Sequence, residues 1–395
     1  MNRRTRKAAY QLAVFIIILT LLIYVNQPPS STRTFAWSTV RYRTTARSLP
    51  AAHGVCPGLA KSKKPALVVS HVQSDGDTSW LTDSDLAKKY HLCIYDVDGS
   101  SPSSSSSVLR TPSNRAHEAM AYLTFLIDNY DAIPAPGAVF IHGNRWSWHN
   151  DAPDYDNAYL LAELNVERAL EPAGYHNLRC DWSVSTCLPD MPPQGSMQMA
   201  LQSKIDPWDA RAASDAALPG ALAAIFGRRD PAELVMLSRH EAVRAQCCAQ
   251  FVVSKERIRS HSREEYVALR QWLLDGADAG TGAALNSGSG SRVVRGHGLA
   301  PKDDRVAGRI ISYIWHILFL DVTGAAGRWG GSGGEGSAGM ELDVLNRAAC
   351  PSAQDCYCRL YGRCDLQCRS PGSCVGQYSI PPGYQVPGHG PKDEA

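Results

Sequence analysis

Residues 142–151 contain the densest set of side chains capable of chemistry in this sequence. They read His-Gly-Asn-Arg-Trp-Ser-Trp-His-Asn-Asp, directly after a short apolar run. Imidazole and carboxylate groups transfer protons, while indole faces beside amides suit a sugar ring, which stacks through C–H groups and hydrogen-bonds through hydroxyls. We predict His142, His149 and Asp151 as catalytic residues and Asn144 as a cofactor-binding residue. The alternative is a scaffold role, with both tryptophans in the core and His149 capping the next helix.

Further polar residues follow other apolar runs or begin a helix, and we predict that they bind a cofactor. They are Asp75, Asp96, Asn114, Arg115 and Glu118. A cation in the first turn of a helix opposes the helix dipole unless an anion binds there, so Arg115 beside Asn114 indicates a phosphate. The alternative is an exposed Arg115 paired with Glu118.

The Asp96-Val97-Asp98 segment has a spacing that lets two carboxylates hold one divalent cation. We therefore predict Asp96 and Asp98 as metal ligands, with Mn²⁺ or Mg²⁺ as the ion. The same spacing is frequent by chance, so the alternative is a carboxylate that caps a turn.

Strands and helices alternate along the chain and must position these residues. Short apolar runs predict buried strands at 66–69, 92–95, 138–141 and 251–253. Helical periodicity is found from 113 or 114 to before 134, over 156–171, from 230 towards 251, and over 262–276. This alternation predicts an α/β fold with a mostly parallel sheet and helices on both faces. Because ligands bind beyond the carboxyl ends of such strands, we expect the polar residues on one rim.

An apolar segment near the N-terminus predicts one membrane span. Residues 8–25 are interrupted only by Gln11 and Thr20, and as a helix they measure about 27 Å. A cleaved signal peptide is the alternative, but no small-residue cleavage site follows. The basic residues in 1–7 predict a signal anchor with a cytosolic N-terminus, which makes the chain a single-pass type II membrane protein.

Composition divides the rest of the chain. We expect a stem or linker, a lumenal α/β domain with two mobile Gly-rich insertions, and a Cys-rich C-terminal extension. Their ranges are 26–62 for the stem, 63–345 for the domain, 276–298 and 323–340 for the insertions, and 346–395 for the extension. Lys and Arg number 40 against 38 Asp and Glu, and four of the basic residues lie before the span. This balance gives no support for a nucleic-acid partner.

The cysteines indicate an oxidising compartment. All 12 follow the apolar segment, and six lie between 350 and 374 without the paired CxxC motifs of a zinc ribbon. We predict disulfides, with 15 connectivities open for the C-terminal six. Cys180 and Cys187 could pair with each other, and of Cys247 and Cys248 at most one is expected to face a partner. The compartment would be the Golgi or endoplasmic reticulum lumen, or the cell surface.

Four separated motifs carry a family resemblance. SNRAHEAMAYLTFLIDNYDAIP, VFIHGNRWSWHN, GYHNLRC and YIWHILF occur in this order. With them the chain resembles the fungal family known as domain of unknown function 3431, over about residues 65–320. That family implies no reaction by itself.

A more distant resemblance concerns the lumenal glycosyltransferases of the GT-A type. The strand end IYD, the loop with Trp80 and the stretch CCAQFVVSKERIRSHSREEYVALRQWL are similar to theirs. This resemblance implies a GT-A-like fold, a nucleotide sugar as donor, and an acceptor wall shaped by Phe251, Ser254, Arg257 and Ile258. The chain departs from the pattern where the central strand ends, because His142-Gly143-Asn144 stands in place of the metal-binding D-x-D. Either other groups hold a metal, or basic residues neutralise the diphosphate.

The expected function is therefore nucleotide-sugar-dependent transfer to a glycan or glycoconjugate. Two alternatives remain open. One is a hydrolase whose metal is held by His142, His149, Asp151 and Asp98. The other is a membrane-anchored protein that binds carbohydrate without catalysis.

Overall fold

The structure of the 395-residue chain is a computed structural model. It describes residues 3–26, 34–44, 50–51, 53–82, 85–99, 109–151, 153–227, 235–278, 298–322 and 340–380. The two insertions predicted at 276–298 and 323–340 lie almost entirely outside the described residues, as does the predicted helix start at 230.

A six-stranded sheet forms the centre of the domain, with strand order β4-β3-β2-β5-β7-β6. Its strands are β2 (Ala66–His71), β3 (His91–Asp96), β4 (Leu109–Arg110), β5 (Ala138–His142), β6 (Tyr175–Asn177) and β7 (Phe251–Val253). Neighbours β4, β3, β2 and β5 are parallel, whereas β7 pairs antiparallel with both β5 and β6. The α/β class and the mostly parallel sheet are confirmed.

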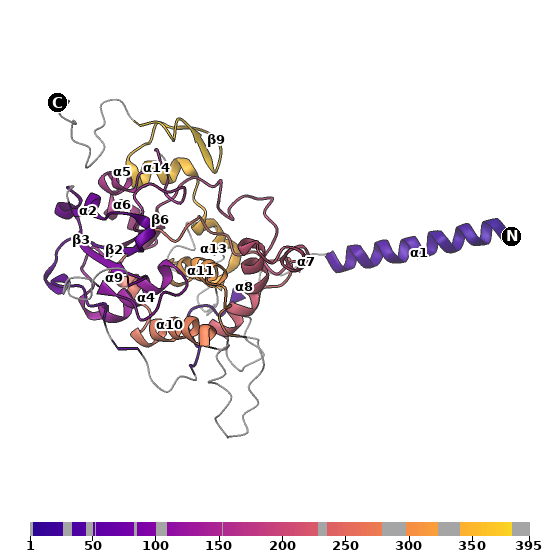
Figure 1. The fold of residues 1–395 in the computed structure, drawn as a ribbon. Coiled ribbons are helices and arrows are strands. Elements are labelled where there is room, and N and C mark those ends of the chain that lie inside the picture. The colour runs from indigo at the N-terminus through magenta and orange to yellow at the C-terminus, as the bar shows by residue number, and fades with distance from the viewer. Residues whose placement is uncertain are drawn as a thin grey trace, which may run out of the picture.

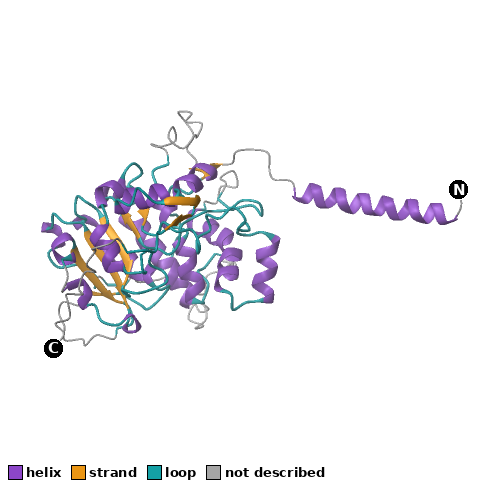
Figure 2. Cartoon of the chain, turned by 90° about the horizontal axis from the view of Figure 1, so that it is seen from above, coloured by secondary structure: helices purple, strands orange, loops and turns teal. Residues whose placement is uncertain are grey.

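Helices pack on both faces of this sheet, because successive strand residues point to opposite sides. Val68 and Phe140 belong to one buried cluster, and their chain neighbours Val69 and Ile141 belong to the other. The first cluster takes in α4 (Glu118–Asp128), α8 (Ala210–Phe226), α9 (Lys255–Arg259), α10 (Arg263–Asp278), α11 (Asp304–Ser312), α12 (Trp315–Phe319) and α13 (Leu342–Ala349). The second takes in α2 (Ser79–Thr82), α3 (Leu86–Lys89), α5 (Asn157–Glu163), α6 (Val166–Leu170) and α14 (Ala353–Tyr361). Figures 1 and 2 show the strands enclosed by helices.

Short 3-10 helices complete the connections, at η1 (Leu59–Lys61), η2 (Gln73–Asp75) and η3 (Tyr130–Ala132). Two predicted helices differ in extent from the structure. The helix expected from 113 or 114 begins at Glu118, because Ala116 and His117 have φ of 58° and 53°, outside the helical region. The helix expected over 156–171 is divided into α5 and α6, and the side chain of Asn165 caps the second by accepting from the backbone N–H of Arg168.

The helix predicted from 230 towards 251 is wrong over its described residues, since 235–250 contain no helix. The backbone N–H groups of this segment bond to distant side chains instead of to a helical neighbour. Val243 donates to Gln194 (3.0 Å), Arg244 to Asn346 (2.7 Å) and Ala245 to Thr186 (2.9 Å). Tertiary contacts therefore override the local periodicity here.

Helix α1 (Arg3–Asn26) projects from the domain as a single helix (Figure 1). Its segment Arg3–Ile23 has a mean hydropathy of 1.8, and it is the one helix among the described residues long and apolar enough to cross a membrane. Signal sequences near an N-terminus meet the same criterion. α1 is thus a candidate membrane span.

Several described residues within the predicted stem, 26–62, pack on the domain. β1 (Thr34–Phe35) pairs with β8 (Met340–Glu341), and the side chain of Trp37 is wholly buried. The Trp37 indole N–H donates to the carbonyl of Val235 at 2.8 Å. Burial of the aromatic residues at 35 and 37 stabilises this packing, because a fully buried large apolar side chain contributes about 1.5–3 kcal/mol.

Six disulfides join the described cysteines: Cys56–Cys93, Cys180–Cys356, Cys187–Cys350, Cys247–Cys248, Cys358–Cys364 and Cys368–Cys374. The suggested pairing of Cys180 with Cys187 is wrong, since each bonds to the C-terminal region. The expectation for Cys247 and Cys248 is also wrong, because they bond to each other.

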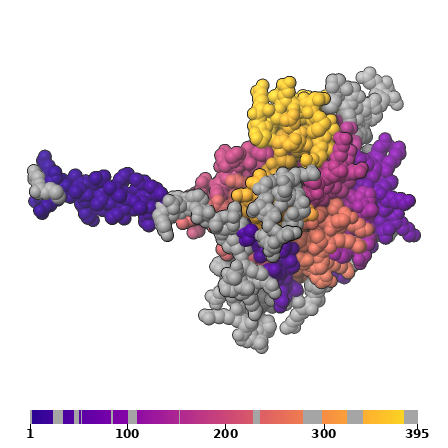
Figure 3. All heavy atoms as spheres, turned by 180° about the vertical axis from the view of Figure 1, so that it is seen from behind, coloured from indigo at the N-terminus to yellow at the C-terminus, as the bar shows by residue number. Residues whose placement is uncertain are grey.

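The C-terminal region is part of the domain over its described residues 346–380. Helix α14 packs in the second buried cluster, and the hairpin β9 (Gln367–Ser370) and β10 (Ser373–Val375) follows it. Figure 3 shows this region in yellow as a block of atoms that lies on the rest of the domain. Two disulfides that span 176 and 163 residues hold it there.

Candidate functional site

A cavity of about 560 Å³ lies at the carboxyl ends of β2 and β5. The chain passes from β2 to β3 and β4 on one side, then returns across β2 to form β5 on the other side. At such a reversal of strand order the two following loops separate, and open α/β sheets bind their ligands in the crevice between them. The cavity is lined from both loops, by residues 70–75 on one side and 142–149 on the other.

Six of the predicted site residues line this cavity together. They are Asp75, Asn114, Glu118, His142, Asn144 and His149. They come from the ends of β2 and β5 and from the residues that lead into α4. The sequence therefore located this rim, although four other predicted residues lie elsewhere.

Asp151 and Arg115 have partners away from the cavity. The Asp151 carboxylate accepts from the backbone N–H of Cys180 and from the Tyr357 hydroxyl (2.8 Å), and its side chain is buried. Arg115 pairs with Asp304 and donates to the carbonyls of neighbouring loops. Both residues hold chain segments together at these positions.

Asp96 and Asp98 lie at the end of β3, outside the cavity lining. Asp96 is buried and pairs in register with His71 of β2, and Asp98 accepts from the backbone N–H of Gln73 at 2.9 Å. Their proposed metal remains a prediction.

The four ligands expected for a hydrolase do not assemble into a metal cluster. Within the described part of the chain, the one group of three or more residues with ligand atoms close enough for a metal is Cys56, His91 and Cys93. Its two cysteines form a disulfide, which removes the thiolates a metal would need.

The two histidines of the site are stacked, with ring centroids 5.2 Å apart. His142 Nε2 lies 2.8 Å from the carbonyl oxygen of Cys248. A carbonyl only accepts, so Nε2 carries the proton and the neutral ring keeps Nδ1 as an acceptor. His142 is therefore suited to take a proton through Nδ1.

His149 lies between other rings and polar groups. Its Nδ1 is 2.8 Å from the Ser147 hydroxyl oxygen, and its ring centroid lies 3.9 Å from the ring centroid of Trp148. Burial, together with the neighbouring His142, Arg179 and His117 side chains, lowers the pKa of His149 to about 4. His149 is thus neutral at pH 7 and serves as a hydrogen-bonding group.

Two non-glycine residues at the cavity have a positive φ, a backbone conformation that such residues rarely adopt. His117 lines it with a φ of 53°, and Ala249, with a φ of 56°, directly follows Cys248 in its wall. Non-glycine residues in this region cost about 1–3 kcal/mol each and persist where surrounding structure holds them, frequently at functional sites. The strain supports a functional role for this end of the sheet.

Two glycines permit the close approach of the elements that form the walls. A Cβ at Gly143 would lie 2.9 Å from Asp75 Oδ2 and 3.0 Å from His71 Cα. At Gly308 it would lie 3.1 Å from both the Ala116 carbonyl oxygen and the ring of His117. The first glycine brings the two loops together, and the second brings α11 against the start of α4.

Sequence reasoning missed the wall formed by α11 and its C-terminal cap, from which Arg305, Arg309, Ser312 and Tyr313 line the cavity. Arg309 donates to the Tyr313 hydroxyl (3.3 Å), and its buried Nε has no hydrogen-bond partner. The spacing of Arg305, Arg309 and Ser312, at i, i+4 and i+7, could have indicated a polar helix face.

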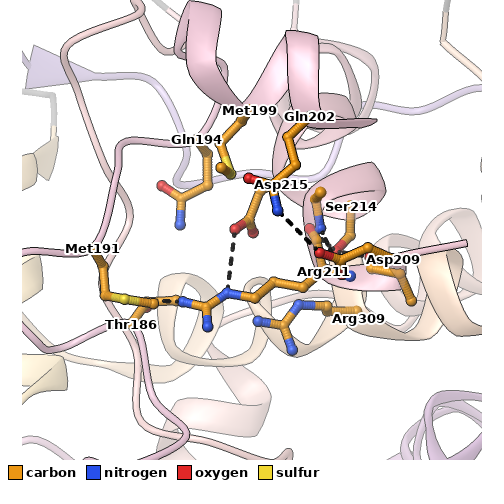
Figure 4. A network of polar contacts seen from close by, with 12 residues as sticks. Thr186, Met191, Gln194, Met199, Gln202, Asp209, Arg211, Ser214, Asp215 and Arg309 are labelled. Atoms are coloured by element: carbon orange, nitrogen blue, oxygen red, sulfur yellow. Dashed lines mark hydrogen bonds and ion pairs between the residues drawn. The ribbon is translucent and has the colours of Figure 1, made fainter. Parts of the chain in front are cut away.

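Behind this wall lies a polar network around Asp215, drawn in Figure 4 with Arg211 and Arg309 below the carboxylate. Asp215 accepts from Tyr313 (2.8 Å) and pairs with Arg211 (3.9 Å). Burial raises the pKa of Asp215, while Tyr313, Arg309 and Arg211 act to lower it. The network fixes the position of Tyr313 and of the neighbouring Arg309.

A further wall comes from the segment before β7, which sequence reasoning placed in a helix. Gln246 and the bonded Cys247 and Cys248 line the cavity. The buried amide nitrogen of Gln246 has no hydrogen-bond partner, so it is a donor that a ligand could satisfy.

The acceptor wall implied by the distant resemblance does not line this cavity. Phe251 and Ile258 are wholly buried in the core. Ser254 caps α9 by accepting from the backbone N–H of Arg257, and Arg257 donates to the carbonyl of Phe319 at 2.9 Å.

These features define an open α/β protein with a strained, polar cavity at the reversal point of its sheet. The family described as "Protein of unknown function (DUF3431)" matches residues 67–359, so the chain belongs to that family and this prediction is confirmed. No curated protein and no solved structure matches the chain.

Proposed function

We propose that this protein is a glycosyltransferase-like enzyme that takes a nucleotide sugar as donor and transfers the sugar to a glycan or glycoconjugate. The observation that carries the proposal is the cavity itself. It combines imidazole, carboxylate, guanidinium and indole groups at the reversal point of a mostly parallel sheet. A volume of about 560 Å³ is within the range of small-ligand sites.

Arg309 supports a subsite for the diphosphate of the donor. The side chain of Arg309 lines the cavity, and its buried Nε–H group is a hydrogen-bond donor without a partner. Arg305 lies one helical turn away at the cavity edge, and Asn114 lines the cavity from the segment before α4, which packs against α11. Departure of a nucleoside diphosphate leaves negative charge, which such fixed donors stabilise in the transition state.

His142 is the proposed base. In its neutral form Nδ1 can accept the proton of an acceptor hydroxyl as that oxygen attacks the sugar, and Nε2 holds the ring against the Cys248 carbonyl. Asp75 and Glu118 line the same cavity and can accept hydrogen bonds from sugar hydroxyls. The exposed indole of Trp148 offers a face for a sugar ring.

A divalent metal, Mn²⁺ or Mg²⁺, belongs to the proposal as an option. Asp75 and Glu118 supply the oxygen ligands such ions prefer, and an ion there would add positive charge beside the diphosphate. Asp96 and Asp98 are the other oxygen pair at this edge of the sheet. Arg305 and Arg309 can neutralise the diphosphate without an ion, so metal dependence is a direct test.

The proposed location is the lumenal side of the secretory pathway or the cell surface. Helix α1 is a candidate span, and six disulfides are compatible with an oxidising compartment. Basic residues before the span favour a cytosolic N-terminus, and thus a type II topology.

The test is release of nucleoside diphosphate from a panel of UDP- and GDP-sugars, with oligosaccharide acceptors and with Mn²⁺ or EDTA. We expect the full chain to consume one donor, and His142→Ala to lower the rate by about 10²–10⁴-fold. His91→Ala is the matched control, because His91 lies outside the cavity and bonds to the Pro57 carbonyl. Full activity of His142→Ala, or no consumption of any donor, would contradict the proposal.

A second candidate, carbohydrate binding without transfer, rests on two tryptophans at this rim. Trp146 and Trp148 are 47% and 59% exposed. Two large apolar side chains exposed so close together indicate a surface that a ligand covers. Saturable oligosaccharide binding that needs no nucleotide, together with no donor consumption, would favour it.

A further inference from the structure

Helix α7 (Met197–Ile205) exposes an apolar face to solvent. Met197, Leu201 and Ile205 are 69%, 57% and 72% exposed, and Trp208 just beyond the helix is 77% exposed. The three helical residues are spaced at i, i+4 and i+8, so they lie along one side of the helix. Single exposed apolar residues are ordinary, but a contiguous set that includes a tryptophan marks an interaction surface.

The helix that carries this face is firmly held. Ser196 caps it by accepting from the backbone N–H of Met199, and Met199 is buried. α7 packs against α8, whose Leu218 and Leu222 belong to the core. The exposed face therefore belongs to an ordered element, and the described residues do not cover it.

The position of α7 relates it to α1. Only seven residues, 27–33, separate the end of α1 from β1, and they span at most about 25 Å. The chain then runs along α8, where the backbone N–H of Arg41 donates to the carbonyl of Ile225 at 2.7 Å. Figure 1 shows α7 and α8 on the side of the domain from which α1 projects, and the view from behind in Figure 3 agrees.

The chemistry of the face suits the boundary between lipid chains and headgroups. Tryptophan is enriched at that depth, and aliphatic side chains beside it enter the edge of the hydrocarbon. Lys204 is exposed next to Ile205, and its long side chain can reach the phosphates while its methylenes lie along the apolar surface.

We propose that the α7 face, meaning Met197, Leu201, Ile205 and Trp208, docks on the surface of the bilayer that α1 spans. The short connection keeps the face near the membrane, so docking adds a second contact without a large entropic cost. The domain would then have a fixed orientation on the membrane. This inference does not depend on the proposed activity.

The test uses the intact chain in phosphatidylcholine vesicles with brominated acyl chains, which quench nearby tryptophan fluorescence. The first tryptophan of the sequence is Trp37, so α1 contributes no signal. We expect quenching in the wild type, and loss of most of it in Trp208→Phe. Trp148→Phe, which removes another exposed indole, should leave the quenching unchanged.

A second variant separates docking from a folding defect. Met197→Ser with Leu201→Ser and Ile205→Ser changes only exposed side chains, so the circular dichroism spectrum should match the wild type. We expect it to abolish the quenching of Trp208. No bromine-dependent quenching in the wild type would overturn the proposal, as would self-association through this face with Trp208 still unquenched by lipid.

Discussion

The segment after β5 contains two regions that use the same residue types for different purposes. The pocket wall consists of His142, Asn144, Ser147, Trp148 and His149. The loop base consists of Arg145, Asn150, Asp151 and Asp156, all buried. The wall lines the cavity and includes the half-exposed indole of Trp148, whereas the base bonds to the protein itself.

In the loop base, the polar side chains form hydrogen bonds with other groups of the protein. Arg145 donates two hydrogen bonds to Asp156, at 2.8 and 3.0 Å, and Asn150 donates to the carbonyls of Arg145 and Tyr155. In the wall, His142 keeps an acceptor at Nδ1, and elsewhere in the cavity lining Gln246 and Arg309 keep buried donors without partners. The hydrogen-bonded loop base therefore holds the pocket wall in place, and the groups of the wall remain available to a ligand.

The largest expected effect comes from breaking the buried ion pair of the base. Arg145→Met leaves the Asp156 carboxylate buried and unpaired, so we expect the free energy of unfolding to fall by about 3–5 kcal/mol. Urea denaturation of the full chain in detergent measures this. The double variant Arg145→Met with Asp156→Leu should recover part of the loss. A change below about 1 kcal/mol in the single variant would show that the base is not rigid.

The next largest effect separates a structural from a catalytic Asp151. Asp151→Asn weakens its hydrogen bonds to Cys180 and Tyr357, and we expect a loss of about 1–3 kcal/mol in stability. The rate of donor consumption per folded molecule should stay unchanged. Tyr357→Phe serves as the matched variant on the other side of the bond. A large fall in the rate of donor consumption with unchanged stability would instead show that Asp151 is a catalytic residue.

The pH dependence of stability tests the wall at His149. Its pKa in the fold, about 4, lies below the ordinary 6.5, so between these values the unfolded chain binds more protons. The free energy of unfolding should therefore fall as pH drops from about 7 to about 4. His149→Gln should reduce that fall by about 1–2 kcal/mol, allowing for solvent screening. If the free energy of unfolding depended on pH equally in the wild type and the variant, the pKa of His149 would not be lowered by burial.

The smallest effect on stability is expected at the exposed indole. Trp148→Ala should change the free energy of unfolding by less than about 0.5 kcal/mol, since the side chain is 59% exposed. Oligosaccharide binding should weaken by about 2–10-fold, as judged from the typical worth of ring stacking. A large loss of stability would contradict this assignment and show that Trp148 has a structural role like that of the loop base.

The sequence predicted the sheet better than the site. Four strands were located because runs such as 138–141 are continuously apolar, and the rim followed from parallel strands that end together. The roles of Arg115 and Asp151 could not be read locally, since their partners Asp304 and Tyr357 are about 190 and 206 positions away. The spacing of Arg305, Arg309 and Ser312 indicates a polar face on α11, but the sequence does not show that this face packs against the cavity, so the α11 wall was missed.

We propose above all that the cavity between the loops after β2 and β5 binds the nucleoside diphosphate part of a nucleotide sugar. Isothermal titration of UDP and GDP into the full chain, with and without Mn²⁺, tests it most directly. We predict saturable binding of one of them at one site, weakened at least about 10-fold in Arg309→Gln and unchanged in Arg359→Gln, an arginine outside the cavity. Binding by neither nucleotide, or equal affinity in a folded Arg309→Gln protein, would contradict the account.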